Sequence, residues 1–489
     1  MEMDRRRFFA LAGTAAGAAL LSACTGGGSN SGSSSSNKTG TLKWWDQFQP
    51  ISAYEKQLFA SYGKEKDGMT VQYTVQNPST FPRELQLAFQ SKQLPDVFTA
   101  ATAGLPAATL QAAGWFQPLN IDKAHQDMLP KGTLVEGLNK FDGKVYSIPV
   151  LSFRSHDTLT WYNKDLLTKA NLDPSKPPNT YDEIRAAARA IQKTGGNVSG
   201  WIAPLNLTTR LSAQITQMAQ AAGAPVNNDG LNLHTGEYAF TSEQFINALE
   251  FWVAMKQDGV LLPSSTTLDA RTARARWATG VAGIFMDGSY NVGVIKASFA
   301  DFMPKVVVAG IPVPSADTKV TVTNFPGNPA LSLWIAKTSP HGDAASDLIS
   351  RFATEEVQIG VAEGMDQPPL RTDVLPKAKV EQVYRQAVDL LSKEVFAGPV
   401  PEARNQDVAK VNAQRKPITP DLGTVIAGAV SGNTADWKGA LTKLVSDLNA
   451  ERDRAIKAVQ AKGAKVSHDD WVFSNWNPDQ DYTPKHYNA

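Results

Sequence analysis

The chain has 489 residues, and its 48 lysines and arginines nearly balance 47 aspartates and glutamates, leaving a formal net charge of +1 at pH 7. This balance excludes attraction by net charge to nucleic acid or to an anionic membrane surface. A single cysteine excludes a small scaffold held together by disulfides. The length exceeds what one hydrophobic core normally serves, so two domains are expected.

Residues 1–23 have the pattern of an export signal. Arg5–Arg7 precede an uncharged, mostly apolar run at 10–21, which is shorter than the roughly 20 residues needed to cross a bilayer. The arginines also fit a twin-arginine signal, so the export route stays open between the general and the twin-arginine pathway. We therefore expect residues 1–23 to be a signal peptide.

Cys24 is the only cysteine, and it follows the apolar run directly. Leu21–Cys24 resembles the bacterial lipobox, which implies that Cys24 takes a lipid and becomes the mature N-terminus. The alternative is a small buried cysteine near a loop. Residues 25–40 contain no apolar side chain, so residues 24–40 are predicted to be a flexible tether spanning about 20–25 Å. The expected location is the outer face of the bacterial cell membrane, with the lipid on Cys24 as the only membrane contact.

The next segments alternate between strand and helix patterns. Residues 40–48 favour a strand, 51–66 a helix, and 69–76 a half-buried strand with alternating apolar residues. A helix is predicted to start at Thr80, and 95–98 favour a short buried strand. Strand, helix and strand in this order indicate parallel pairing and an α/β fold.

Later segments continue the mixed pattern. Thr180–Glu183 and Thr241–Gln244 both read as capping boxes, and each opens an amphipathic helix. Residues 300–337 are strand-like again, and helices are expected to dominate from about 340. The tail at 468–489 is rich in aromatic and turn residues, which predicts that its aromatic side chains pin it to the body. Its alternating Asn and Asp residues resemble a calcium loop, although the loop glycine and the bidentate glutamate are missing.

Six short motifs, in this order and spacing, resemble one protein family: Leu94–Phe98, Gly114–Leu119, Gly143–Pro149, Tyr162–Leu166, Pro177–Glu183 and Gly280–Tyr290. The family comprises the extracellular solute-binding lipoproteins of bacterial ABC importers, in the sugar-binding class that includes maltose-binding protein. The last motif carries Tyr290 where the family has tryptophan. The motifs are spread over most of residues 41–370.

The resemblance implies an α/β, two-lobe periplasmic-binding-protein type II fold with hinge strands and an interlobe cleft. Lobe one is expected at 41–153 plus 288–335, and lobe two at 154–287 plus 336–489. The chain is expected to cross between the lobes near 152–160, 285–290 and 324–334.

A carbohydrate site needs flat aromatic rings for the sugar faces and charged or amide groups for the hydroxyls. The candidate ligand-binding residues are Trp45, Asp46, Thr99, Arg154, Asp157, Trp201, Asn206, Asp287, Tyr290, Asn324, Phe325, Met365, Asp366 and Arg371.

Position supports these candidates. Trp45, Asp46 and Thr99 follow or end predicted strands, and open α/β sheets bind ligands at the carboxyl ends of their strands. Arg154 and Asp157 lie in the first crossing, where the arginine has the geometry to bridge two hydroxyls or a uronate carboxylate. The alternatives are strand packing, turn hydrogen bonds and an ion pair between Arg154 and Asp157.

The remaining candidates rest on the resemblance. Tyr290, with Asp287 beside it, stands at the family position that supplies a stacking ring. Trp201 and Asn206 lie in a segment that often faces the cleft in the family, and Asn324 and Phe325 lie in a loop beside it. Met365, Asp366 and Arg371 follow a predicted helix end. For each of them, core packing or surface capping is the alternative.

The predicted function is the substrate-binding component of an ABC importer, which captures a carbohydrate, most simply an oligosaccharide, by hinge closure. The expected partners are the carbohydrate and the transmembrane subunits of the ABC permease; a monomer without cofactor, metal or nucleic acid is expected.

Two alternatives stay open. An exported hydrolase is disfavoured by the absence of GxSxG, HExxH and Walker motifs, but the two carboxylates of a glycosidase have no fixed spacing. A non-sugar solute such as a polyol phosphate would need a cationic cluster in the cleft, and the sequence shows only scattered arginines.

Overall fold

The structure is a computed structural model that describes residues 40–66, 68–101 and 105–488. The expected signal peptide, Cys24 and the tether up to residue 39 lie outside the described residues. Within the described part, no helix has the length and apolar character of a membrane span.

One sheet is built mainly from the first third of the chain. Its strand order is β2-β1-β3-β13-β4, and β7 pairs with β13 beside this path. β1 runs parallel to β2 and β3, as the strand–helix–strand pattern predicts, whereas β13 is antiparallel to its neighbours. The strands are β1 (Gly40–Asp46), β2 (Met69–Val75), β3 (Val97–Thr99), β4 (Phe116–Gln117), β7 (Ser147–Pro149) and β13 (Ser332–Ala336).

Helices from the first third of the chain and from residues 342–363 pack on this first sheet. The predicted helix start at Thr80 is confirmed, because Thr80 is the N-cap of α2 and Pro82 occupies its first turn. One core includes residues of β1, β3 and β13 together with Leu348 and Val361 from much later in the chain. The helices of this part are α1 (Ser52–Glu65), α2 (Phe81–Gln90), α3 (Ala107–Ala112), α4 (Lys123–Met128), α11 (Gly342–Ser350) and α12 (Glu355–Glu363).

A second sheet has the order β11-β8-β10-β9, in which β8 is antiparallel to both β10 and β11. Its strands are β8 (Leu159–Asn163), β9 (Ser199–Ile202), β10 (Ala282–Asp287) and β11 (Val306–Ala309).

The capping box at Thr180 and Glu183 is confirmed. The second predicted box is wrong by one residue, because Ser242 and not Thr241 caps the helix by accepting from the Phe245 backbone N–H. The helices around this sheet are α5 (Lys164–Lys169), α6 (Tyr181–Gln192), α7 (Thr208–Ala221), α8 (Glu243–Gln257), α9 (Ala270–Ala278) and α10 (Asn291–Ser298).

Sheet membership departs from the expected lobe boundaries at two places. β11 belongs to the second sheet, although 288–335 was expected in lobe one, because β11 pairs along β8. Helices α11 and α12 contribute to the core of the first sheet, although 336–489 was expected in lobe two. The chain therefore passes between the sheets after β7, between β11 and β13, and after α12, and not near 285–290.

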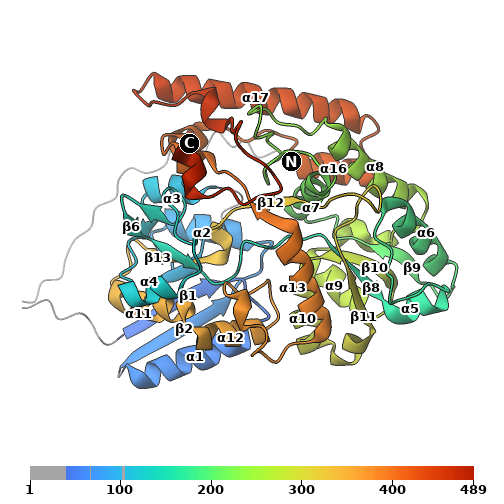
Figure 1. The fold of residues 1–489 in the computed structure, drawn as a ribbon, viewed down its shortest axis with the longest axis horizontal. Helices are drawn as coiled ribbons and strands as arrows, with labels where there is room; N and C mark the ends of the chain where they lie inside the picture. Colours follow the sequence, from blue (N-terminus) through green and yellow to red (C-terminus); the bar gives the residue numbers. More distant parts are fainter. Residues whose placement is uncertain (1–39, 67, 102–104, 489) are drawn as a thin grey trace, which may run out of the picture. The chain divides into compact units, whose positions relative to one another are not determined.

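The C-terminal third joins both parts (Figure 1). β14 pairs with β12 beside the second crossing, and helix α15 contacts α3, where Thr109 donates a hydrogen bond to the Ala409 carbonyl. The expected pinning of the tail is confirmed by the buried rings of Phe473, Trp476 and Tyr482. These elements are β12 (Val322–Asn324), α13 (Gln382–Glu394), β14 (Val395–Ala397), α14 (Pro401–Arg404), α15 (Val408–Gln414), α16 (Leu422–Ser431) and α17 (Trp437–Gln460).

Candidate ligand-binding cleft

A cavity of about 300 Å³ lies between the two sheets. On one side, Gln47 follows β1 directly and Asn77 lies two residues past β2, so the parallel pairing of these strands brings both to the same sheet edge. This edge is where open α/β sheets bind ligands. On the other side, α7 and α9 contribute Arg210 and Arg274, and the crossing segments contribute Asp157.

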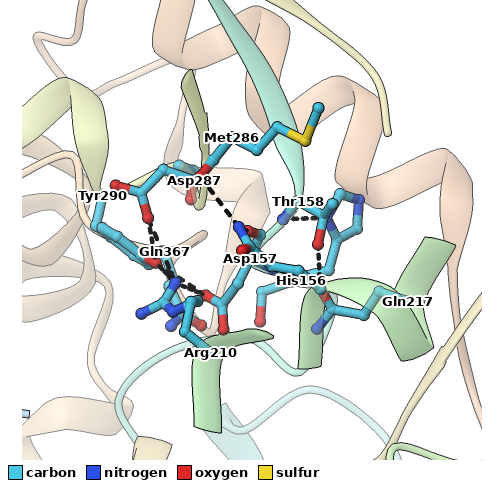
Figure 2. A network of polar contacts seen from close by, with 12 residues as sticks. His156, Asp157, Thr158, Arg210, Gln217, Met286, Asp287, Tyr290 and Gln367 are labelled. Carbon is cyan, nitrogen blue, oxygen red and sulfur yellow. Dashed lines mark hydrogen bonds and ion pairs between the residues drawn. The ribbon is translucent and has the colours of Figure 1, made fainter. Parts of the chain in front are cut away.

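The second-sheet side of the cavity holds a network of charges (Figure 2). Arg210 Nη1 lies 2.9 Å from an Asp157 oxygen and 3.3 Å from an Asp287 oxygen. Arg274 Nη2 lies 2.6 Å from the other Asp287 oxygen. The Tyr290 hydroxyl lies 2.7 Å from Asp287 and 3.0 Å from Asp157, and it accepts a hydrogen bond from Arg210. Because the hydroxyl has one proton, it donates to one of the two carboxylates at a time.

Asp287 does not line the cavity, and its ion pairs hold the two arginines in place. Its side chain is buried at the end of β10, and burial raises its pKa while Arg274 and Arg210 oppose that shift. Two arginine partners on its two oxygens fix the positions of α7 and α9 relative to β10. The candidate Asp287 is therefore placed to orient the arginines and not to contact a ligand.

Asp366 faces the cavity from the segment that follows α12. It is buried, and one oxygen accepts a hydrogen bond of 2.8 Å from the Gln367 backbone N–H. Burial raises the pKa of Asp366 to about 7, with smaller contributions from Asp46 and Asp157. At neutral pH its carboxyl therefore has the capacity both to donate to and to accept from a hydroxyl.

Amide groups complete the lining. Gln217 accepts hydrogen bonds through Oε1 from the Asp157 backbone (3.0 Å) and from the Thr158 hydroxyl (2.5 Å), which leaves its NH2 to donate into the cavity. Asn324 also lines the cavity, but its amide donates to the carbonyls of Phe153 and Ser155. Asn324 thus ties two crossing segments together.

Four of the candidate residues reach the cavity, namely Asp157, Tyr290, Asn324 and Asp366. The Tyr290 ring has the Arg210 and Arg274 guanidinium carbons over it at 5.4 and 5.0 Å from its centroid. Arginines therefore lie over the ring that was expected to stack on a sugar.

Several candidates lie in the core instead. Trp201 is fully buried edge-on against Trp252, and Met365 packs in the same core. Thr99 is fully buried in the first sheet. Asp46 is fully buried and accepts hydrogen bonds from Trp44, Phe48 and Tyr73. Trp45 packs on the opposite core from Trp44, because both faces of this sheet are covered.

The remaining candidates lie elsewhere on the described chain. Arg154 and Arg371 line a second cavity, where Arg154 pairs with Asp481 and Arg371 with Asp373. The alternative of an ion pair between Arg154 and Asp157 is wrong, because Arg154 pairs with Asp481 and Asp157 pairs with Arg210. Phe325 packs against Val135, Leu138 and Val400, and Asn206 is exposed outside the cavity lining.

The structure adds residues that the sequence analysis missed, chiefly Arg210, Arg271, Arg274 and Gln217. The spacing of Arg271 and Arg274 was a usable signal, because residues three apart share a helix face. Nothing local connects this pair with Arg210, which lies on another helix. Among the described residues, no group of three or more His, Cys, Asp or Glu side chains is placed to hold a metal ion.

A family model described as bacterial extracellular solute-binding protein matches residues 45–359. The sn-glycerol-3-phosphate-binding periplasmic protein of Rhizobium meliloti is 23% identical over 440 residues, which cover 85% of this chain and 94% of that protein. The maltotriose-binding protein of Pyrococcus abyssi is 23% identical over 427 residues, covering 86% and 81%.

Solved structures share the fold. An ABC transporter solute-binding protein from Thermotoga lettingae bound with α-D-tagatose superposes with a TM-score of 0.65 at 21% identity, covering 85% of this chain and all of that one. The predicted two-lobe, type II periplasmic-binding-protein fold is confirmed by this likeness.

Proposed function

This chain belongs to the family of bacterial extracellular solute-binding proteins, and from that membership we propose that it captures a carbohydrate for an ABC importer. The relatives described above are named for binding maltotriose and sn-glycerol-3-phosphate, and one structural neighbour holds tagatose. All three solutes are polyhydroxylated. A carbohydrate is therefore the simplest ligand class for this cavity.

The carrying observation is that both sides of the cavity present hydrogen-bonding groups. Gln47 and Asn77 come from the first sheet, and Asp157 and Gln217 come from the other side. Arg271 Nη2 donates across the cavity edge to the Gln76 carbonyl at 2.9 Å. A ligand that contacts both sides binds the closed arrangement better than the open one, and so drives hinge closure by that difference in affinity.

The direct test is a carbohydrate screen of the purified Cys24→Ser protein by thermal shift, followed by calorimetry and product analysis. We expect one carbohydrate series to bind with a stoichiometry of one and to raise the melting temperature, with no product formed. Turnover of a bound oligosaccharide would favour the exported-hydrolase alternative. Failure of every carbohydrate to bind would contradict the proposed function.

Membrane attachment is a separate part of the proposal, and it rests on the sequence. Cys24 carries a lipid after removal of residues 1–23, and the lipid holds a monomer near the transmembrane subunits of its permease. Metabolic labelling with a radioactive fatty acid tests this. Wild-type protein is expected to take the label and to remain with the membrane fraction, whereas Cys24→Ser takes none.

A further inference from the structure

Three arginines converge on the cavity from two helices. Arg210 lies in α7, whereas Arg271 and Arg274 lie three residues apart in α9 and share one face of it. Helix α8 lies between α7 and α9 in the sequence, so only the fold brings Arg210 together with this pair. The cationic cluster that a charged solute would need is therefore present.

The three arginines differ in their partners. Arg210 is paired with Asp157 and Asp287, and Arg274 is paired with Asp287. Within the described residues, no carboxylate lies at ion-pair distance from Arg271. Its guanidinium donates a hydrogen bond to the Gln76 carbonyl. A guanidinium has five N–H donors, so most of those on Arg271 remain for a ligand.

The surroundings of Arg271 make its positive charge unusual. Its side chain is partly buried, and burial and the neighbouring Arg274 lower its pKa, whereas the charge of Asp269 opposes this shift. Asp157 and Asp287 are already matched by Arg210 and Arg274. Asp366, the further carboxyl of the lining, has a pKa raised to about 7 and forms no ion pair with Arg271. Arg271 is thus the arginine of this cluster that no carboxylate of the described residues pairs with, and an anionic group on a ligand would fill that place.

Aromatic groups give a second, independent indication. Among the described residues, Phe48, His156 and Tyr290 are the aromatic side chains of the cavity lining; His156 is buried, and the Tyr290 ring already has two arginines over it. A neutral sugar is usually held by free ring faces, and this cavity offers few. Charged recognition fits the lining better than stacking does.

We propose that the ligand carries a carboxylate or a phosphate on a sugar or polyol, and that Arg271 binds this anionic group. The inference rests on the proposed function, because it specifies the solute class of the same cavity. The planar guanidinium fork matches the two oxygens of either group. Because Arg271 also reaches the Gln76 carbonyl, an anion held there links ligand charge to closure of the cavity.

The experiment compares matched ligands by calorimetry: a neutral sugar, the corresponding uronate, the corresponding phosphate ester, and inorganic phosphate alone. The uronate and the ester distinguish the two sources of charge. At least one anionic sugar is expected to bind about tenfold or more tightly than the neutral one. Equal affinity for inorganic phosphate and for the ester would overturn the carbohydrate part of the proposal.

Substitutions at Arg271 test whether this residue binds the anionic group of the ligand. Arg271→Gln is expected to weaken the anionic sugar about 10- to 100-fold, as loss of a hydrogen bond to a charged group does, and to leave a neutral sugar unaffected. Arg271→Lys, which keeps the charge but not the fork, should fall between. Arg276→Gln is the matched control, because Arg276 lies in the same helix outside the cavity lining and donates to Ser264.

The outcomes separate the two proposals. A neutral carbohydrate that binds wild type and Arg271→Gln equally, and no less tightly than its anionic forms, would overturn this inference and leave the transport function standing. Failure of all carbohydrates, charged or neutral, to bind wild type would overturn both. Unchanged melting temperatures of the unliganded variants show that a loss of affinity is not a loss of folding.

Discussion

Asp46, Glu55 and Tyr73 form a hydrogen-bonded cluster at the first sheet. The Tyr73 hydroxyl lies 3.0 Å from Asp46 and 2.5 Å from Glu55. One phenolic proton serves only one of these contacts, so the other needs a proton on a carboxyl. Burial, with the charge of Asp46, raises the pKa of Glu55 well above its usual range, and burial raises the pKa of Asp46 to about 6. Glu55 is therefore the protonated member at neutral pH.

This cluster makes folding stability depend on pH. A carboxyl whose pKa is higher in the folded than in the unfolded chain stabilises the fold at low pH, and that stability is lost as the pH rises through the folded pKa. We expect the free energy of unfolding to fall as the pH rises from 5 to 8. The fall should be less steep in Glu55→Gln, and the slopes of the two proteins should differ by up to about 1.4 kcal/mol per pH unit, because one titrating carboxyl is removed. Denaturant unfolding at several pH values measures both slopes.

The control for this prediction is Glu243→Gln, since Glu243 is also a first-turn glutamate but is exposed on α8. It should keep the wild-type slope. Equal slopes in wild type and Glu55→Gln would show that Glu55 does not hold the extra proton.

Asp287 supports a second residue-scale prediction. Asp287→Asn leaves the Arg210 and Arg274 guanidiniums without their shared counter-charge in a buried place, which typically costs about 3–5 kcal/mol. Chemical denaturation should show this loss. Asp127→Asn removes the exposed pair with Lys123 and should change stability by less than about 1 kcal/mol. Similar effects of the two substitutions would contradict the role assigned to Asp287.

At the scale of elements, the C-terminal tail contacts β14 and the first segment that crosses between the sheets. Asp481 accepts from the Ala397 backbone N–H at 2.9 Å and pairs with Arg154 in the first crossing. The Tyr482 backbone N–H donates to the Ala397 carbonyl at 2.7 Å, so the tail continues alongside β14. Phe473 is fully buried where the tail meets the body.

The tail is therefore expected to contribute to the stability of the whole fold. Phe473→Ala removes a fully buried ring and should lower the free energy of unfolding by about 3–5 kcal/mol. Lys485→Ala, at an exposed position of the same tail, should have almost no effect. Denaturant unfolding compares them, and a small loss for Phe473→Ala would mean that the tail docks independently of the core.

At the scale of the whole described body, Gly293 in α10 lies very close to the segment that follows α12 and to Pro50. A Cβ added there would lie 2.2 Å from the Gly364 carbonyl oxygen and 2.7 Å from the Pro50 Cβ. Pro50 lines the cavity from the first-sheet side, whereas α10 packs on the second-sheet core. Gly293 therefore permits a close contact between α10 and the first-sheet side of the cavity, and we expect closure to depend on it.

A side chain at this position should favour the open arrangement. Gly293→Val is expected to weaken ligand affinity about tenfold or more, because overpacking of the closed contact costs about 1–3 kcal/mol. Calorimetry gives the affinity, and small-angle scattering should show a larger radius of gyration with ligand than wild type has. Ala297→Val, at an exposed position of the same helix, is the control. Unchanged affinity in Gly293→Val would exclude this contact from closure.

Local patterns in the sequence determined much of the fold. The alternation at 69–76, the helix start at Thr80 and the capping box at Thr180 all correspond to observed elements. The family motifs added the two-lobe architecture. The expected lobe boundaries are wrong where strands pair over a long distance in the sequence, as β11 does with β8. Such pairing leaves no trace in the residues next to the strand in the sequence.

The site was only partly determined by the sequence. Asp157 and Tyr290 were found because the family resemblance places their segments at the cleft, and Asp366 because it follows a predicted helix end, whereas Trp201 and Met365 lie in the core. A ring or an apolar side chain suits a ligand platform and a hydrophobic core equally, so residue type alone does not separate the two. The tertiary structure alone decided that Arg210 meets Arg271 and Arg274, because the packing of α7 and α9 around Asp287, and not any local spacing, brings their charges to one cavity.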